Sequence, residues 1–289
     1  MPASLLITGA TGHLGRAVVA QLLTGTSAGR IAALTRDAGR AADLAERGVD
    51  VRVGSYDDRA SLDAAVAGID TVLLISSGDE GDRLRQHRTV IDTAAAAGVR
   101  RLAYTSRSLA DPGSLRNALM GEHFETEAMI RESGLAPVIF RNALYMDAVP
   151  QFVGGARALE SGIFLPAGDG RVAFALRREQ GEAIANALLL PDARALYTLT
   201  GPAAWSFGDV AEALGAVAGT AVSYTDVSEE AFRAGMAQRG LPEAVVGKVT
   251  AFVLDVRAGQ EATVTPELAD LLGRAPASLA DGLREVFGL

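Results

Sequence analysis

The amino-terminal stretch of this 289-residue chain restricts its fold more than any other, because a short apolar run leads straight into three regularly spaced glycines. The run is Leu5–Ile7 and the glycines are Gly9, Gly12 and Gly15, in the order LLITGATGHLG. Residues 16–23 then carry apolar side chains at helical spacing. The pattern predicts a buried strand, a tight turn and a helix.

A turn of this kind is suited to a phosphate group. A helix that begins directly after a turn presents unpaired backbone N–H groups and the positive end of its dipole, and these hold a pyrophosphate without a cationic side chain. Gly9 would make the turn, Gly12 would let the backbone approach the ligand, and Gly15 would let the helix pack close to the strand. We therefore predict a dinucleotide site. The turn residues assigned to it are Gly9, Thr11, Gly12, His13, Leu14 and Gly15.

Strand and helix patterns alternate along the first half of the chain. The later strands are expected at 30–36, 49–54, 71–76, 99–106 and 135–141, with helices at 38–47, 59–67, 83–97 and 121–131. This alternation predicts an α/β fold, a Rossmann-type doubly wound parallel sheet.

The regular alternation ends near residue 142. Residues 142–170 are rich in glycine, proline and aromatic residues without steady periodicity, which is typical of binding loops. Helical patterns dominate the remainder, at 182–190, 207–218, 229–239 and 278–287, with one strand expected at 196–200. We expect residues 1–150 to form an NAD(P)-binding domain. Residues 151–289 would form a smaller, mostly helical substrate-binding domain, some segments of which can rejoin the first sheet.

Composition excludes several classes of protein. The net charge is -8 and the arginines are scattered, so nucleic acid would be repelled. The lack of cysteine excludes disulfides, thiolate zinc sites and a cysteine nucleophile, and the three histidines lack the spacing of metal ligands, so no metal site is predicted. No apolar run approaches the roughly 18 residues that cross a bilayer, and no basic leader precedes the first strand. We expect a cytoplasmic protein without membrane contact.

Charged residues follow the second and third expected strands. An arginine at the end of the second strand accommodates the extra phosphate of NADP, whereas an acidic residue there binds the ribose of NAD. Arg36 therefore favours NADP(H), and Asp37 just beyond it leaves NAD(H) as the alternative. Either Asp57 or Asp58 can cap helix 59–67, and Asp57 can instead face the adenine edge.

Serines end the fourth and fifth expected strands. Ser76, Ser77 and Gly78 follow an apolar run typical of a central parallel strand, and Ser106 ends the next strand. Because parallel strands end at the same edge of a sheet, we expect Ser76, Ser77, Gly78 and Ser106 to lie beside the cofactor.

Several motifs together resemble one family. The motifs are GATGHLG, LLISSG, QHRTVID, YTS, GEHFETE, FRN and the C-terminal LLGRAPASLADGL. With them the sequence is similar to the NmrA-like atypical short-chain dehydrogenases, and within them to the type 2 NAD(P)H:quinone oxidoreductases. The resemblance implies hydride transfer from NADPH to a quinone without flavin. The family's usual RNGWYxEN reads RNALYMDA here, so Asn142 and Tyr145 match and the departures fall where the substrate is expected.

The catalytic residues of ordinary short-chain dehydrogenases are not all present. Ser106 takes the place of their serine, but Leu119 replaces the proton-donating tyrosine and His123 replaces the lysine. Reduction of a simple ketone by that acid is therefore not expected. A quinone needs less acid assistance, because the charge of a hydroquinone anion is delocalised, and the protein then supplies mainly proximity and orientation.

Five residues are assigned to the reaction and the substrate. His123 and Asn142 would donate hydrogen bonds to a quinone oxygen, and Tyr145, Phe152 and Phe174 would form an aromatic slot, with Tyr145 also near the reacting atoms. The alternatives are a backbone partner for His123, a loop or carboxamide contact for Asn142, and core packing for the aromatic residues. The remaining histidines, His13 and His87, are interpreted as structural.

Two other functions stay open. In one, a bound polycyclic phenol or quinone is reduced and then reacts with dioxygen, so that the protein is a monooxygenase or hydroxylation component in aromatic natural-product biosynthesis. In the other, the chain binds NAD(P) without turnover and regulates a partner, as some NmrA-like proteins do. The sequence leaves the oligomeric state, including a homodimer, undefined.

Overall fold

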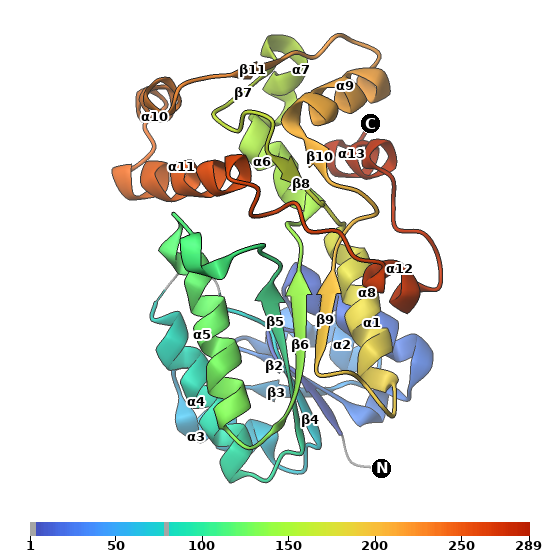
Figure 1. Ribbon diagram of the computed structural model, residues 1–289. Helices are drawn as coiled ribbons and strands as arrows, with labels where there is room; N and C mark the ends of the chain where they lie inside the picture. Colours follow the sequence, from blue (N-terminus) through green and yellow to red (C-terminus); the bar gives the residue numbers. More distant parts are fainter. Residues whose placement is uncertain (1–3, 78–80) are drawn as a thin grey trace. The chain divides into compact units, whose positions relative to one another are not determined.

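The computed structural model describes residues 4–77 and 81–289 (Figure 1). Gly78, expected beside the cofactor, lies outside the described residues. The described chain divides into two compact units, and each is assembled from separate stretches. The first holds residues up to 107 together with 122–142 and 177–198, and the second holds 108–121, 143–176 and 199–289. The expected domains, 1–150 and 151–289, stay a prediction.

A parallel sheet forms the centre of the first unit. Among the described residues it has seven strands in the order β3-β2-β1-β4-β5-β6-β9. The order reverses between β1 and β4, where Ile7 of β1 lies between Ala33 of β2 and Leu73 of β4. The strands are β1 (Leu5–Ile7), β2 (Ile31–Thr35), β3 (Asp50–Val53), β4 (Thr71–Leu74), β5 (Arg101–Arg107), β6 (Ala136–Asn142) and β9 (Leu196–Leu199). The predicted Rossmann-type doubly wound sheet is confirmed.

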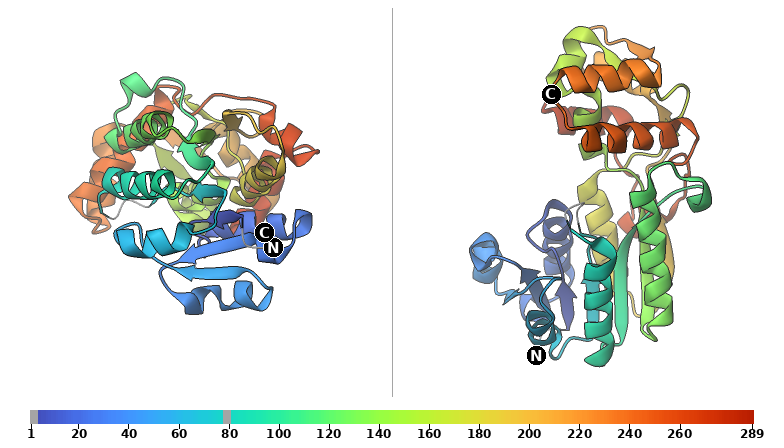
Figure 2. Two further views of the ribbon diagram at one scale, coloured as in Figure 1. Left: turned by 90° about the horizontal axis from the view of Figure 1, so that it is seen from below. Right: turned by 90° about the vertical axis from the view of Figure 1, so that its left-hand side faces the viewer.

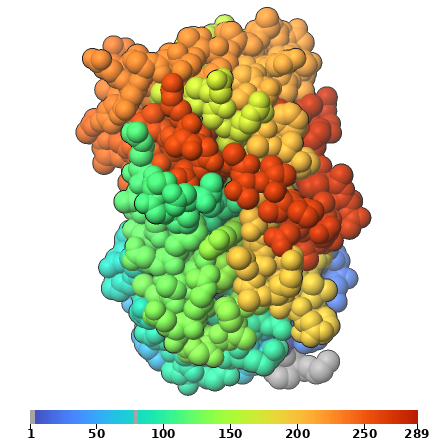
Figure 3. All heavy atoms as spheres, viewed as in Figure 1, coloured from blue at the N-terminus to red at the C-terminus, as the bar shows by residue number. Residues whose placement is uncertain are grey.

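Helices cover both faces of this sheet (Figure 1). The helices α3, α4 and α5 bury Leu62, Ile91 and Ile130 against one face, and α1 and α8 lie side by side on the other. Figure 3 shows side chains of α5 and α8 at the surface of the unit in the same view. The helical segments are α1 (His13–Gly25), η1 (Ala28–Arg30), η2 (Ala38–Ala41), α2 (Ala42–Glu46), α3 (Arg59–Val66), α4 (Arg83–Ala96), α5 (Ala118–Glu132) and α8 (Arg177–Leu189).

Side-chain hydroxyls end β4 earlier than the sequence pattern predicts. The expected strand runs to residue 76, but the N–H of Ile75 donates to the Thr8 hydroxyl at 2.9 Å and that of Ser76 to the Thr105 hydroxyl, also at 2.9 Å. These hydroxyls replace the backbone partners that a longer strand would use. The loop that begins at Ile75 is therefore attached to both neighbouring strands.

The second unit is built from short elements around an apolar core. Residues 142–170 contain α6, α7 and β7, so the lack of periodicity there does not reflect a lack of regular structure, because elements this short leave no visible period. The binding role of this stretch stays a prediction. Two two-stranded sheets form among the described residues: β7 pairs with β11, and β8 pairs with β10. The elements are η3 (Pro112–Ser114), η4 (Met146–Ala148), α6 (Val149–Val153), η5 (Gly155–Arg157), α7 (Ala158–Ser161), β7 (Ile163–Leu165), β8 (Arg171–Val172), β10 (Trp205–Ser206), α9 (Phe207–Ala218), β11 (Tyr224–Asp226), α10 (Glu229–Gln238), α11 (Glu243–Arg257), α12 (Glu267–Leu272) and α13 (Leu279–Phe287).

Candidate functional site

The glycine turn has the conformation that its spacing predicts. Gly9 has a φ of +57°, which favours glycine, and its carbonyl accepts the N–H of Gly12 at 3.0 Å. A Cβ atom on Gly15 would lie 2.3 Å from the Gly9 carbonyl oxygen, so the helix approaches the turn too closely for any other residue. Among the described residues no side chain caps α1, whose N-cap is Gly12. The first amides of α1 therefore remain available to an anion.

The other turn residues are placed on or beside the start of this helix. Thr11 is half-buried and precedes the Gly12 cap. His13 is exposed and is the first residue of α1, and Leu14 is buried beneath it. Thr11 and His13 therefore expose part of their side chains at the start of α1, whereas the side chain of Leu14 is enclosed.

Tyr56 joins the strands beneath the turn. Its hydroxyl donates to the Ile75 carbonyl at 2.9 Å and also hydrogen-bonds to the Thr8 hydroxyl. Burial raises the pKa of Tyr56, so the phenol stays neutral. The sequence analysis did not single out Thr8 or Tyr56. The available signals were a polar residue directly after the first buried strand and a tyrosine shortly after the third strand.

Arg36 is exposed at the end of β2. Within the part of the chain that the structure describes, its guanidinium forms no hydrogen bond or ion pair. The Asp37 carboxylate instead accepts the N–H of Gly39 at 2.9 Å and caps η2. An exposed cation therefore lies where the second strand ends, while the neighbouring carboxylate is already engaged.

Asp57 and Asp58 have different partners. Asp58 caps α3 by accepting the N–H groups of Ala60 and Ser61 at 3.1 and 3.3 Å. The Asp57 carboxylate accepts Arg85 at 2.6 Å and Gln86 at 3.0 Å, and the Arg85 hydrogen bond holds its pKa below the ordinary value. The capping interpretation thus belongs to Asp58. Asp57 is an ionised group attached to the first turn of α4.

A buried carboxylate orients the end of β5. The Ser106 hydroxyl is buried and donates to Glu127 at 2.6 Å. Arg141 and Arg131 also donate to Glu127, at 2.8 and 2.7 Å. Burial alone would raise the pKa of Glu127, but the hydrogen bonds from Arg141, Ser106 and Arg131 hold it below the ordinary value. The hydroxyl hydrogen of Ser106 is therefore directed toward Glu127, and only its oxygen lone pairs remain for another partner.

His123 is nearly enclosed, with 7% of its surface exposed. Its Nδ1 lies 2.9 Å from the hydroxyl of Tyr104, a fully buried residue of β5. Burial, with the positive charges of Arg83 and Arg107, holds the pKa of His123 well below its ordinary value, so the imidazole is neutral near pH 7. The partner is a side-chain hydroxyl and not the backbone group considered as the alternative. Asn142, the last residue of β6, is also buried.

The aromatic residues assigned to the substrate belong to the second unit. Phe174 is fully buried and meets Phe207 edge to face, with ring centroids 6.1 Å apart. Phe152 stacks on Phe252 at 4.9 Å. Tyr145 is half-buried and precedes η4. Phe152 and Phe174 thus contribute to the core of this unit, and the aromatic slot stays a prediction.

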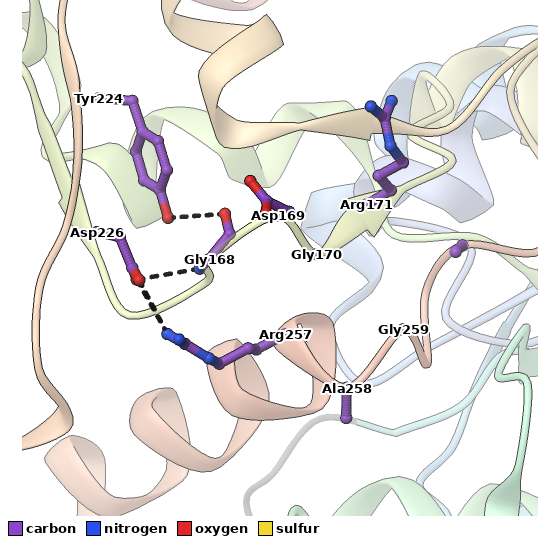
Figure 4. Close-up of a pocket in the computed structure, with 10 residues that line it drawn as sticks. Gly168, Asp169, Gly170, Arg171, Tyr224, Asp226, Arg257, Ala258 and Gly259 are labelled. Atoms are coloured by element: carbon purple, nitrogen blue, oxygen red, sulfur yellow. Dashed lines mark hydrogen bonds and ion pairs between the residues drawn. The ribbon is translucent and has the colours of Figure 1, made fainter.

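A polar hollow of about 620 Å³ opens on the second unit (Figure 4). Asp226 accepts the N–H of Gly168 at 3.0 Å and Arg257 at 3.0 Å, and the Tyr224 hydroxyl donates to the Gly168 carbonyl at 3.2 Å. Burial, with the charge of Asp226, raises the pKa of Tyr224 to about 12. Arg171 on the same wall is engaged by Asp209. These charged groups satisfy one another, and they join β11 to the loop before β8.

Two searches of the described residues bear on metals and membranes. No group of three histidine, cysteine or acidic residues in that part of the chain could hold a metal ion. Among the same residues, no helix combines the length and the apolar character needed to cross a bilayer.

The fold and the turn define the class of the protein. A doubly wound parallel sheet with an uncapped helix after a β1 glycine turn is the arrangement that binds dinucleotides at the carboxyl ends of the strands. The chain belongs to the NmrA-like family, whose model matches residues 1–268.

Three relatives show what the chain resembles. It is 35% identical over 287 residues to quinone oxidoreductase 2 of Escherichia coli, with 99% of each chain covered. The structure of that enzyme complexed with NADPH matches with a TM-score of 0.90, and the match covers 98% of this chain and 99% of the other. Triphenylmethane reductase of Citrobacter sp. complexed with NADP(H) matches with a TM-score of 0.90 at 32% identity, covering 98% and 100%. The NAD(P)H azoreductase of Xenophilus azovorans is 30% identical, with 83% of each chain covered.

Proposed function

We propose that this chain is an NADPH-dependent oxidoreductase that transfers hydride to a quinone or a related planar conjugated carbonyl compound, without flavin or metal. The observation that carries the proposal is the full-length likeness to a quinone oxidoreductase whose structure holds NADPH. The names of the other relatives support the class, because triphenylmethane dyes and azo dyes are also extended conjugated acceptors.

The residues of the first unit fit a nicotinamide dinucleotide. A Cβ atom at Gly15 would fill the space that the turn needs, and the uncapped amides of α1 suit a diphosphate. Arg36 would bind the 2′-phosphate, because its guanidinium is exposed and Asp37 is already engaged by the backbone. Asp57 would approach the adenine edge from the loop after β3, where Arg85 of α4 holds its carboxylate. When bound, the nicotinamide supplies the hydride.

The acceptor would be oriented by neutral hydrogen-bonding groups. His123 is kept uncharged by burial and bonds Tyr104 through Nδ1, so its Nε2 would meet a quinone oxygen. Asn142 would supply an amide at the end of β6, and Tyr145 a phenol. Ser76, Ser77 and Ser106 would contact the cofactor at the ends of β4 and β5. Since the anion of a hydroquinone is delocalised, these groups need only orient the ring and solvate the developing charge.

Turnover with a panel of acceptors tests the proposal. Purified chain, NADPH and benzoquinone, naphthoquinone, an azo dye or a triphenylmethane dye are mixed, and the loss of reduced nicotinamide absorbance is followed. We expect oxidation of NADPH by a quinone with one NADPH consumed per hydroquinone formed. The visible spectrum and metal analysis of the active protein should show neither flavin nor bound metal.

The same assay distinguishes the alternatives. Oxygen uptake that requires both NADPH and an aromatic substrate would favour the monooxygenase. Saturable NADPH binding without turnover on any acceptor would favour the regulatory protein and would refute the reductase.

A further inference from the structure

Both peptide groups of Ser77 are bonded to side chains of α4. The Ser77 N–H donates to Nε2 of His87 at 3.1 Å, and Nε of Arg83 donates to the Ser77 carbonyl at 3.3 Å. The Ser77 hydroxyl oxygen lies 3.5 Å from the same histidine nitrogen. Because the Ser76 N–H donates to the Thr105 hydroxyl, the chain after β4 is held at three backbone polar groups of two neighbouring residues.

The same two side chains also join α4 to α5. Arg83 forms an ion pair with Glu122 at 3.2 Å, and Nδ1 of His87 lies 2.9 Å from the Thr126 hydroxyl. Arg83 and His87 are four residues apart on α4, and their partners are four residues apart on α5. The two contacts therefore lie one helical turn apart. The right-hand view of Figure 2 shows α4 in teal and α5 in green running next to each other. We call Arg83, His87, Glu122 and Thr126 the α4–α5 ladder.

The hydrogen-bond directions in the ladder are determined. A backbone N–H can only donate, so Nε2 of His87 must carry a lone pair and Nδ1 must carry the proton. Nδ1 therefore donates to Thr126, whose hydroxyl donates in turn to the Glu122 carbonyl at 2.9 Å. His87 and Thr126 are fully buried and Arg83 is 5% exposed. Burial and the charge of Arg83 lower the pKa of His87 to about 3, which preserves this single neutral tautomer.

We propose that the α4–α5 ladder positions Ser76 and Ser77, which follow β4, for contact with the cofactor, with His87 as the positioning residue that holds the Ser77 peptide. The inference rests on the proposed function, because it takes the end of β4 as part of the NADPH site. With the peptide groups of Ser77 engaged inside the protein, the loop meets the cofactor through the hydroxyls of Ser76 and Ser77. A buried support of this kind holds contacting groups in place without touching the ligand.

Three substitutions distinguish the two hydrogen bonds of His87, and a fourth serves as the control. In His87→Gln the amide oxygen replaces Nε2 and keeps an acceptor for Ser77, whereas in His87→Asn the amide nitrogen replaces Nδ1 and keeps a donor for Thr126. Thr126→Val removes the second bond from the other side. Thr93→Val is the matched control, since Thr93 is equally buried on α4 and, within the described part of the chain, its hydroxyl bonds only the Thr89 carbonyl, at 2.6 Å.

The first measurement needs no cofactor. In the ¹⁵N spectrum of the wild-type protein, His87 should show a protonated Nδ1 and a bare Nε2. Exchange of the Ser77 amide should be about tenfold or more faster in His87→Asn than in wild type, and close to wild type in His87→Gln and Thr93→Val. Equal Ser77 exchange in the Gln and Asn variants, or an Nε2-protonated His87, would overturn the ladder.

The second measurement is NADPH binding. The dissociation constant should rise about tenfold in His87→Asn. It should stay within about threefold of wild type in His87→Gln and Thr93→Val. If Ser77 exchanges rapidly in His87→Asn and NADPH binding is unchanged, the positioning role is refuted while the proposed function stands. If the wild-type chain itself fails to bind NADPH, the proposed function is refuted and the cofactor role of the ladder with it, whatever the exchange rates show.

Discussion

The turn after β1 and the loop after β4 end neighbouring strands of one sheet but are held in place by different means. The β1 turn depends mainly on backbone geometry: Gly9 takes a positive φ, and Gly15 lets the helix touch the turn. The β4 loop contains ordinary serines that are held by Thr105, Arg83 and the buried His87. A contiguous stretch thus encodes the first, and distant side chains build the second.

This difference predicts which substitutions each region tolerates. The glycine turn should fail when any side chain is added, because no rearrangement of partners can make room beside a backbone carbonyl. The β4 loop should tolerate changes that preserve hydrogen-bond roles and fail when a role is lost. Three predictions test this contrast, from the largest expected effect to the smallest.

Gly15→Ala should abolish the function of the β1 turn. The added Cβ would lie 2.3 Å from the Gly9 carbonyl oxygen and 2.7 Å from the Ala10 Cα atom, so the turn must shift. We expect NADPH affinity to fall at least about a hundredfold and the free energy of unfolding to fall by about 1–3 kcal/mol. Titration calorimetry and denaturant unfolding measure both. Gly29→Ala is the control, because its Cβ would meet nothing within 4 Å; equal behaviour of the two variants would contradict a backbone-encoded turn.

Arg36→Ala should change the ligand preference and leave the β2 turn intact, because Asp37 caps η2 without help from the arginine. A charge-assisted contact is worth about 1.5–3 kcal/mol, so NADPH should bind about 10- to 150-fold more weakly. NADH binding should stay unchanged. The exposed Arg47→Ala is the control for net charge. An equal loss of NADPH and NADH affinity would place Arg36 outside the 2′-phosphate contact.

The buried His87 should make the protein less stable in mild acid. The pKa of His87 in the folded protein is about 3, below the ordinary value of 6.5. As the pH falls below 6.5, His87 therefore becomes protonated in the unfolded chain but stays neutral in the folded protein. The free energy of unfolding should therefore decrease by about 1.4 kcal/mol per pH unit from this group. His123 adds a decrease of the same sign.

Urea unfolding between about pH 6.5 and pH 5 isolates the His87 contribution when wild type is compared with His87→Gln. The variant keeps the Ser77 acceptor and cannot take up the proton, so its stability should depend less steeply on pH. Parallel curves for the two proteins would show that His87 is protonated as easily in the folded state as in the unfolded one.

Much of the first unit could be predicted from local patterns. The apolar strands and the helices of 59–67 and 83–97 were placed within a few residues, because period and caps are properties of neighbouring residues. Resemblance identified the family, and the family match confirms it. The stretch 142–170 was missed as structure, since its elements are too short for periodicity and depend on packing in the second unit.

The sequence by itself determined the glycine turn, the parallel alternation and the cation at Arg36, because each depends on residues adjacent in the chain. Only the tertiary structure decided that Asp57 binds Arg85, that Ser106 donates to Glu127 and that His87, interpreted as structural, holds Ser77. The physical reason is that a side chain's hydrogen-bond partner can lie dozens of residues away in the chain. Burial then makes that partner obligatory, since a polar group removed from water must be satisfied inside the protein.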